Sequence, residues 1–268
     1  MAGPREVIAR RAEEVLRRAG QAGVVARVAD ELPQVAGLLE AQPSVLAALT
    51  DIGVRAAAKK ELVADLLGAR VDAFTLELVG LLVEEPLAPE ELLAATRDLV
   101  TTTIMIRARE QGVLRQVEDE LFRFARTVDG APDLRSALTD PRAPGDARRE
   151  IVRSLLESRA LPETVALAVF VLERTGPRDP ARALEEVAEQ AAARRGQVLV
   201  EARAAVPIDV QRRQRLTEAL SRTVGRQVDL EVVLDPSVVG GVVARIGDEV
   251  IDGSVKRKLE RALEELTT

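Results

Sequence analysis

The sequence predicts an α+β fold, with two related all-α helical bundles followed by a small C-terminal β-α-β-β-α domain. Three observations support this prediction. Apolar residues follow a helical period as far as residue 195, and the period changes to two directly afterwards. The helical part matches itself at an offset of 89 residues without a gap. The chain has 268 residues, 47% of them hydrophobic and 31% charged, which suffices for more than one core under a polar surface.

The helical part contains an internal repeat. Residues 23–84 (the first repeat) align with residues 112–173 (the second repeat), and about a third of the aligned positions are identical. Each repeat predicts a long helix, a short helix after Pro43 or Pro132, and a third helix rich in cations and leucine. Because the match keeps prolines and threonines in register, compositional bias does not explain it, and we interpret it as a duplication.

An almost wholly apolar helix is predicted to end each repeat, over residues 74–83 and 165–172. A helix that is apolar on all sides belongs in the centre of a bundle. Helices over 5–19, 90–109 and 180–195 complete the two bundles. The expected domains are therefore residues 1–90, 91–195 and 196–268.

The last domain is predicted to be a small sheet with two helices. Alternating residues from Val198 to Val206 predict the first strand, with one face more buried than the other. Asp209 is the expected N-cap of the next helix. The other expected elements are a helix over 209–224, a strand over 228–234, hairpin arms over 238–246 and 249–251 with a turn at Gly247-Asp248, and a closing helix over 255–266.

The composition excludes most kinds of active site. The chain has no Cys, His, Trp or Tyr and only four Phe. Disulfides, zinc sites with Cys or His ligands, histidine acid/base catalysis and aromatic stacking of bases are thereby removed. The formal net charge of −6 argues against nucleic-acid binding, because that affinity needs surplus Lys and Arg. We expect no cofactor, no metal and no nucleic-acid partner.

No membrane segment or export signal is predicted. The longest apolar run, residues 165–172, is far shorter than the roughly 20 residues that cross a bilayer. The N-terminal residues alternate in charge and lack the apolar stretch of a secretory signal. We therefore expect a cytoplasmic chain without direct membrane insertion.

The C-terminal glycines and acids each allow a structural and a functional interpretation. Gly240, Gly241 and Gly247 lack the Lys-Ser/Thr that follows a phosphate loop, so a bend and a turn are the favoured interpretation. An acidic hairpin tip at Asp248 and Asp252 is favoured over a metal site. Ser254 is interpreted in the same way, as a helix cap instead of a nucleophile.

Residues 234–259 resemble the C-terminal signature of the delta subunit of the F-type ATP synthase, the bacterial counterpart of the mitochondrial oligomycin-sensitivity-conferring protein. Residues 112–173 resemble the helical N-terminal domain of that family. Ordinary bacterial members would begin near residue 90, so the first bundle is extra, as in the long, duplicated form typical of actinobacteria. The structural signature consists of a double glycine, a Gly-Asp turn and an Asp-Gly-Ser break, at Gly240, Gly241, Gly247, Asp248, Asp252, Gly253 and Ser254.

The resemblance implies a non-catalytic stator subunit of the peripheral stalk, at the cytoplasmic face of the cell membrane. It would link the alpha/beta headpiece to the b subunits, so that proton flow is coupled to ATP synthesis. N-terminal helices of alpha subunits would lie in a groove lined by Leu99, Thr103, Ile106, Val165, Val169 and Leu172. The C-terminal end of the b subunit would contact Val255, Leu259, Leu263, Arg212 and Arg213. For each groove residue, plain core packing is the alternative.

Two other functions compete with this interpretation. One is an enzyme or nucleotide-binding module in the C-terminal domain, which would have only carboxylates and hydroxyls for chemistry. The other is a stand-alone helical adaptor or regulatory protein without ATP synthase association. Co-purification with alpha, beta and b subunits discriminates among the three. Two related bundles in one chain also predict two attachment points, either on two alpha subunits or on one alpha subunit and the stalk.

Overall fold

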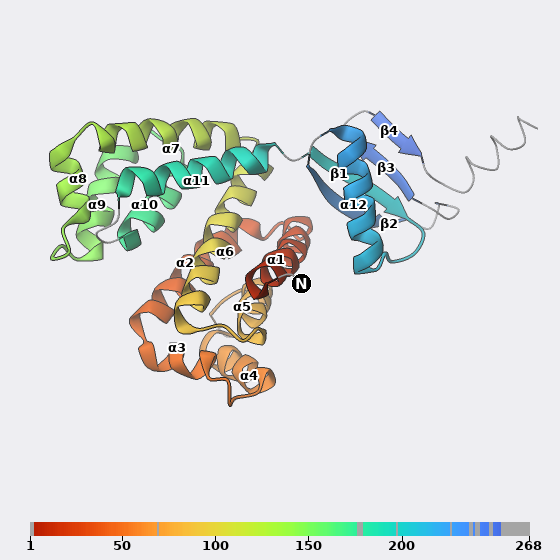
Figure 1. Cartoon of the computed structure of the whole chain (residues 1–268), viewed down its shortest axis with the longest axis horizontal. Coiled ribbons are helices and arrows are strands. Elements are labelled where there is room, and N and C mark those ends of the chain that lie inside the picture. Colours follow the sequence, from red (N-terminus) through yellow and green to blue (C-terminus); the bar gives the residue numbers. More distant parts are fainter. Residues whose placement is uncertain are drawn as a thin grey trace, which may run out of the picture. The chain divides into compact units, whose positions relative to one another are not determined.

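The computed structural model describes residues 3–68, 70–175, 179–196, 198–225, 227–235, 238, 242–246 and 249–252. The chain divides into two compact units, residues 1–192 and 193–268. The first consists of helices, and the second carries a sheet with one described helix (Figure 1). The prediction of helical bundles followed by a small C-terminal domain is confirmed at this level.

Five helices of the first unit had predicted bounds, and each begins and ends within three residues of them. Pro43 and Pro132 occupy the first turn of their helices, where the missing N–H of proline costs nothing. The helices, in chain order, are α1 (Pro4–Gln21), α2 (Val25–Ala41), α3 (Pro43–Thr50), α4 (Ala56–Leu67), α5 (Ala73–Glu84), α6 (Pro89–Glu110), α7 (Leu114–Asp129), α8 (Pro132–Thr139), α9 (Gly145–Leu156), α10 (Pro162–Thr175) and α11 (Pro180–Arg195).

Helices of the two repeats have matching bounds at the offset of 89 residues. The matches α3 with α8 and α4 with α9 hold at both ends, whereas α2 with α7 and α5 with α10 share their first residue. The turns that precede the repeats match as well. Gly23 has a φ of 71° and Gly112 a φ of 73°, the left-handed conformation that ends α1 and α6 and that glycine adopts without strain.

α6 matches both α1 and α11 when the chain is shifted by 89 residues. Shifted by 89 residues, α1 falls on residues 93–110; shifted back by the same amount, α11 falls on residues 91–106. Both ranges lie inside α6, which is therefore the last helix of the first bundle and the first helix of the second. It contacts α1, α2, α3 and α5 on one side and α7 and α10 on the other, and Figure 1 shows it running from one set of helices to the other.

A single hydrophobic core runs through the helical unit, from Ile8 in α1 to Ala191 in α11. α6 lies at its centre, since the middle of this helix is buried on every side. The buried residues there are Leu99, Val100, Thr101, Thr103, Ile104, Met105 and Ile106. The two bundles thus share a helix and a core instead of meeting at a surface.

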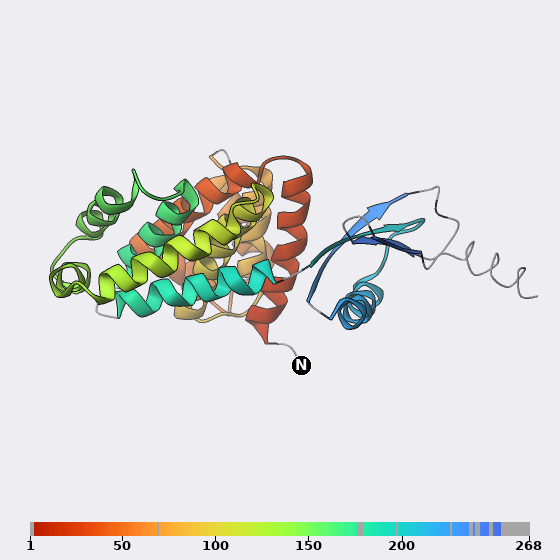
Figure 2. The same cartoon turned by 90° about the horizontal axis from the view of Figure 1, so that it is seen from above.

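The second unit is a four-stranded mixed sheet in the order β2-β1-β3-β4. β1 runs parallel to β2 and antiparallel to β3, and β3 pairs with β4 as a hairpin. The helix α12 connects the two parallel strands and covers one face of the sheet (Figure 2). The bounds are β1 Val198–Ala204, α12 Val210–Val224, β2 Val228–Leu234, β3 Val242–Ile246 and β4 Glu249–Asp252.

One face of the sheet is buried, as the alternation in the first strand predicted. Val200 and Ala202 of β1, together with Leu230 of β2, pack against Leu220 of α12. Asp209 caps α12 as predicted, because its carboxylate accepts a hydrogen bond from the Arg212 amide at 2.8 Å.

Two predicted strand ends differ from the structure. β1 ends at Ala204, and Val206, the last residue of the predicted strand, is 62% exposed because the chain has already turned toward α12. β3 is described from Val242 to Ile246; Val238, the predicted first residue, is buried and is not part of a strand, and residues 239–241 lie outside the described residues. The predicted turn at 247–248 and the closing helix over 255–266 lie outside the described residues.

Candidate partner-binding site

A buried glutamate fixes the start of the apolar helix in the first repeat. The Asp72 amide and the Thr75 hydroxyl donate to one oxygen of Glu31 at 2.8 and 2.7 Å, and Arg27 Nε donates to the other at 2.9 Å. Burial raises the pKa of Glu31, but these hydrogen bonds lower it by more. The pKa therefore lies below that of an ordinary glutamate, and the ionised carboxylate of α2 holds the first turn of α5.

The second repeat builds the same contact. The Leu161 amide and the Thr164 hydroxyl donate to one oxygen of Glu120 at 2.8 and 2.6 Å, and the Gln116 side chain donates to the other at 2.8 Å. Here too burial raises the pKa of the carboxyl, and the hydrogen bonds, led by that of Thr164, lower it by more. α10 is thus attached to α7 as α5 is to α2.

An ion pair between the third and fourth helices of each repeat is also shared. Lys60 of α4 pairs with Glu84 of α5, and Arg149 of α9 pairs with Glu173 of α10 at 2.7 Å. Both pairs hold a cation on the third helix against the last turn of the apolar helix. The scaffold of the two repeats is therefore alike in its polar contacts as well as in its bounds.

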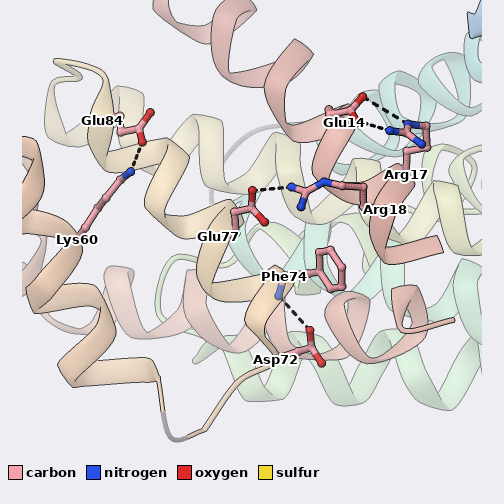
Figure 3. A network of polar contacts seen from close by, with 8 residues as sticks. All are labelled: Glu14, Arg17, Arg18, Lys60, Asp72, Phe74, Glu77 and Glu84. Carbon is pink, nitrogen blue, oxygen red and sulfur yellow. Dashed lines mark hydrogen bonds and ion pairs between the residues drawn. The ribbon is translucent and has the colours of Figure 1, made fainter. Parts of the chain in front are cut away.

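Ion pairs join α1 to α5, the apolar helix of the first repeat (Figure 3). Arg18 of α1 pairs with Glu77 of α5 at 2.5 Å, and its guanidinium lies 5.6 Å from the centre of the Phe74 ring. Arg11 reaches across to Glu84. Burial raises the pKa of Glu84, but hydrogen bonds from Arg11 and Lys60 lower it by more.

The corresponding face of the second repeat, between α6 and α10, carries the predicted groove residues. Thr103 and Leu172 are buried to 0% and 1% exposure. Leu99 and Ile106 are also buried. Val165 and Val169 are the two groove residues that stay partly exposed, and they pack against the same core.

The two faces differ chemically at matching positions. At the offset of 89 residues, Leu99, Thr103 and Ile106 of α6 correspond to Arg10, Glu14 and Arg17 of α1. Arg10 is exposed, and Arg17 pairs with Glu14 along α1. The α6 residues are buried because α6 has helices of both bundles around it, whereas α1 has a free side that must be polar.

Arg107 connects the two repeats. Its Nη1 lies 2.8 Å from Asp30 of α2, and its Nε lies 3.1 Å from Glu163 of α10. The Arg107 side chain is 12% exposed and that of Glu163 is 7% exposed. At the offset of 89 residues, Arg107 and Glu163 correspond to Arg18 and Phe74. The first repeat therefore has a cation–aromatic contact at the positions where the second repeat has a buried ion pair.

The C-terminal unit contributes two described residues to the predicted b-subunit contact. The Arg212 side chain is 74% exposed and lies 3.3 Å from its helix cap, Asp209. Arg213 donates to the Leu230 carbonyl at 2.7 Å and so ties α12 to β2. Val255, Leu259 and Leu263 lie outside the described residues.

Most of the predicted glycine and acid signature also lies outside the described residues. Asp252 is the exception, as the last residue of β4 and opposite Val243 of β3. The positions that are not described are Gly240, Gly241, Gly247, Asp248, Gly253 and Ser254.

Neither a metal cluster nor a membrane span occurs in the described part of the chain. Within those ranges, no three acidic side chains are grouped so as to hold a metal ion. No helix in the same ranges is both long and apolar enough to cross a membrane.

The architecture defines a class, a helical scaffold of two linked bundles with a small mixed α/β unit at its C-terminal end. Residues 102–266 match the model of the ATP synthase delta (OSCP) subunit family, and the chain belongs to this family.

Relatives named ATP synthase subunit delta align over most of the chain. The one from Frankia alni is 44% identical and covers 88% of this chain and 86% of the relative. The one from Parafrankia sp. is 41% identical over 91% and 88%, and that from Nocardia farcinica is 37% identical over 96% of both chains. A chain of the Toxoplasma gondii mitochondrial ATP synthase hexamer aligns at 15% identity and a TM-score of 0.29, covering 63% of this chain and 95% of that one.

The sequence analysis did not identify the polar residues that join helices within each repeat, or Arg107, which joins the two repeats. Glu31 and Glu120 sit in the matched Asp-Glu-Leu, and Thr75 matches Thr164, so the repeat itself contained the signal. A glutamate and a threonine lie 44 residues apart in both repeats, and this shared spacing could have indicated a contact between their side chains. Arg107 had no comparable signal, because its partners lie on helices of different repeats.

Proposed function

We propose that this chain is the stator subunit of the peripheral stalk of an F-type ATP synthase. It would link the alpha/beta headpiece to the b subunits and stop the headpiece from turning with the rotor, so that proton flow is coupled to ATP synthesis. Membership of the delta (OSCP) family carries this proposal. The subunit would add no chemistry and no cofactor of its own, and would lie peripherally at the cytoplasmic face of the membrane.

The N-terminal helix of an alpha subunit would bind beside α10 in the second repeat. Val165 and Val169 support this assignment, because they are one helical turn apart and partly exposed. Leu99, Thr103, Ile106 and Leu172 would form the buried floor beneath the partner helix. The C-terminal end of the b subunit would bind the second unit, where the exposed Arg212 offers a cation to an acidic helix.

The chain would consist of three modules, residues 1–90, 91–195 and 196–268, and the first two would have arisen by duplication. The matching helix bounds, the left-handed glycines and the buried Glu–Thr contacts of both repeats support a common origin. α6 would then be the joint at which the second copy was added, since it completes both bundles.

Two modules give two ways of attachment. If both bind alpha subunits, the second contact becomes intramolecular and avidity rises by roughly 10²- to 10⁴-fold. If only the second module binds alpha, the first is free to brace the stalk. The charged α1–α5 face favours the second arrangement, because the groove positions of α6 are replaced there by Arg10, Glu14 and Arg17.

The experiment that tests the function is a pull-down of the tagged full-length chain from detergent-solubilised membranes. Recovery of alpha, beta and b subunits is expected. Recovery of soluble partners alone would refute the stator function and leave a stand-alone adaptor.

Matched substitutions separate the two ways of attachment. Val165→Ser removes one apolar contact from α10, and Leu76→Ser does the same at the equivalent, partly exposed position of α5. If only the second module binds alpha, the first variant weakens headpiece affinity about tenfold, the loss of about 1.4 kcal/mol, and the second leaves it unchanged. Equal losses would favour two alpha contacts. Full-length variants are used because removing the first module would uncover the core face of α6.

A further inference from the structure

A glycine of the first repeat stands where the second repeat has a partly exposed groove valine. At the offset of 89 residues, Gly80 of α5 corresponds to Val169 of α10, and Leu76 of α5 corresponds to Val165. Leu76 is partly exposed, as Val165 is, but Gly80 is buried. Glycine inside a helix is less stable than alanine, and no positive φ requires it at this position. A neighbouring side chain must therefore cover this part of α5.

That neighbour is Lys60 of α4. Its Cε and Cγ lie 3.8 and 4.0 Å from the point where a Cβ on Gly80 would lie, which is van der Waals contact distance. The aliphatic stem of Lys60 thus lies across α5 at the groove position, while its charged end reaches Glu84. A valine at position 80 would need the space of this stem, because its methyl groups extend beyond the Cβ.

The far end of the Lys60 side chain is held by an ion pair. Figure 3 shows Lys60 reaching from α4 to Glu84 in the last turn of α5. Arg11 of α1 pairs with the same carboxylate, so Glu84 is fixed from two helices. Because the Lys60 backbone belongs to α4 and its ammonium is bound at the end of α5, the stem stays across Gly80.

The cation of the second repeat has an additional partner. Arg149 of α9 corresponds to Lys60 and pairs with Glu173 at 2.7 Å. It also pairs with Asp146, in the first turn of its own helix, at 3.1 Å. The first repeat has alanine at the position that matches Asp146. The guanidinium is thus shared between two acids, and Val169 stays partly exposed beside it.

We propose that Lys60 determines which repeat accepts the partner helix, by closing the groove of the first repeat over Gly80. The identity of that partner, an N-terminal helix of an alpha subunit, rests on the proposed function. A helix beside α5 would contact Leu76 but would meet the Lys60 stem one turn later, where the second repeat offers Val169. To bind there it would have to displace the stem and break its ion pair. The partner helix therefore binds the second repeat.

Thiol labelling of the full-length chain tests the closure without a partner, because the chain has no cysteine. Gly80→Cys places a thiol under the stem, and adding Lys60→Ala should make labelling at least about tenfold faster. Loss of a nearby cation raises the pKa of a thiol and by itself slows labelling, so a faster reaction reports exposure. Glu61→Ala, which removes an exposed charge from the next position of α4, is the control and should change the rate less than about twofold. Equal rates with and without Lys60 would overturn the proposal.

Calorimetric titration with a synthetic peptide of the alpha-subunit N-terminal helix tests the selection. One site is expected on the wild type and two on Gly80→Val/Lys60→Ala, which supplies the groove valine and removes its cover. Two sites on the wild type, or one on this variant, would overturn the role of Lys60. No binding to the wild type would refute the alpha-subunit contact of the proposed function, and the labelling rates would still decide whether Lys60 closes the groove.

Discussion

Replacing Arg107 with methionine tests whether a buried ion pair holds the two repeats together. The substitution keeps an unbranched apolar side chain in α6, in place of the arginine stem, but removes the guanidinium between Asp30 and Glu163. Asp30 is 72% exposed and loses little, because water replaces its partner. Glu163 is 7% exposed and is left in the interior without its cation.

The loss in free energy of unfolding depends on this difference in exposure between Asp30 and Glu163. Removing one partner of a buried pair costs about 3–5 kcal/mol, since the remaining charge stays desolvated. The Arg107 Nε is 3.1 Å from Glu163 but is not aligned as a hydrogen bond, and Glu163 lies in the first turn of α10, where the helix dipole favours an anion. We therefore expect the low end, about 3 kcal/mol, which for a unit of this size lowers Tm by roughly 6–12 °C.

Urea unfolding followed by circular dichroism at the helical band measures this loss. The double variant Arg107→Met/Glu163→Gln should recover most of it, with a coupling energy of about 2 kcal/mol in the cycle. Arg97→Met is the control, because Arg97 also joins α6 to α2, through Glu40 at 2.9 Å, but is 43% exposed and should cost less than about 1 kcal/mol. A coupling near zero, or equal losses for Arg107 and Arg97, would refute the reasoning.

Three further predictions concern caps and pH. Thr75→Val leaves Glu31 buried with one bond fewer and should cost about 1–3 kcal/mol in urea unfolding, while Thr75→Ser, which keeps the hydroxyl, should cost less than half as much. The pKa values of Glu31 and Glu120 are lowered in the folded state, so the stability that these carboxylates contribute is complete above the ordinary glutamate pKa of about 4.3 and is lost as the pH falls through the folded pKa. Glu31→Gln should therefore reduce the fall of the urea midpoint between about pH 5 and pH 3. An unchanged slope of the urea midpoint against pH would contradict this role of Glu31. Asp209→Ala should destabilise α12 by about 1 kcal/mol, seen as faster amide exchange in its first turn, with Asp209→Asn as the tolerated control.

Periodicity predicted the element order well because it records which side of each element avoids water. The change of period at residue 195, the short helices after Pro43 and Pro132, and the cap at Asp209 are local features, and each appears in the structure. The strand end at Val206 was wrong for a related reason: alternation continues into residues that the chain uses for its turn toward α12.

The groove shows what periodicity leaves open. Leu99, Thr103 and Ile106 have the spacing of one helix face, which suits a partner groove and a core equally well. Their burial depends on how many helices surround α6, and that number is set by the second bundle, far away along the chain.

The sequence by itself determined the helix and strand order, the repeat at 89 residues and, through its signature, the family. These depend on local spacing and on self-similarity, which a chain carries whether or not it is folded. Only the tertiary structure decided that one helix, α6, serves both bundles, that Glu31 and Glu120 bind the starts of α5 and α10, and that Arg107 pairs with acids of both repeats. The reason is physical: burial and pairing of a charge are set by neighbours from distant segments, and these come together only when the core forms.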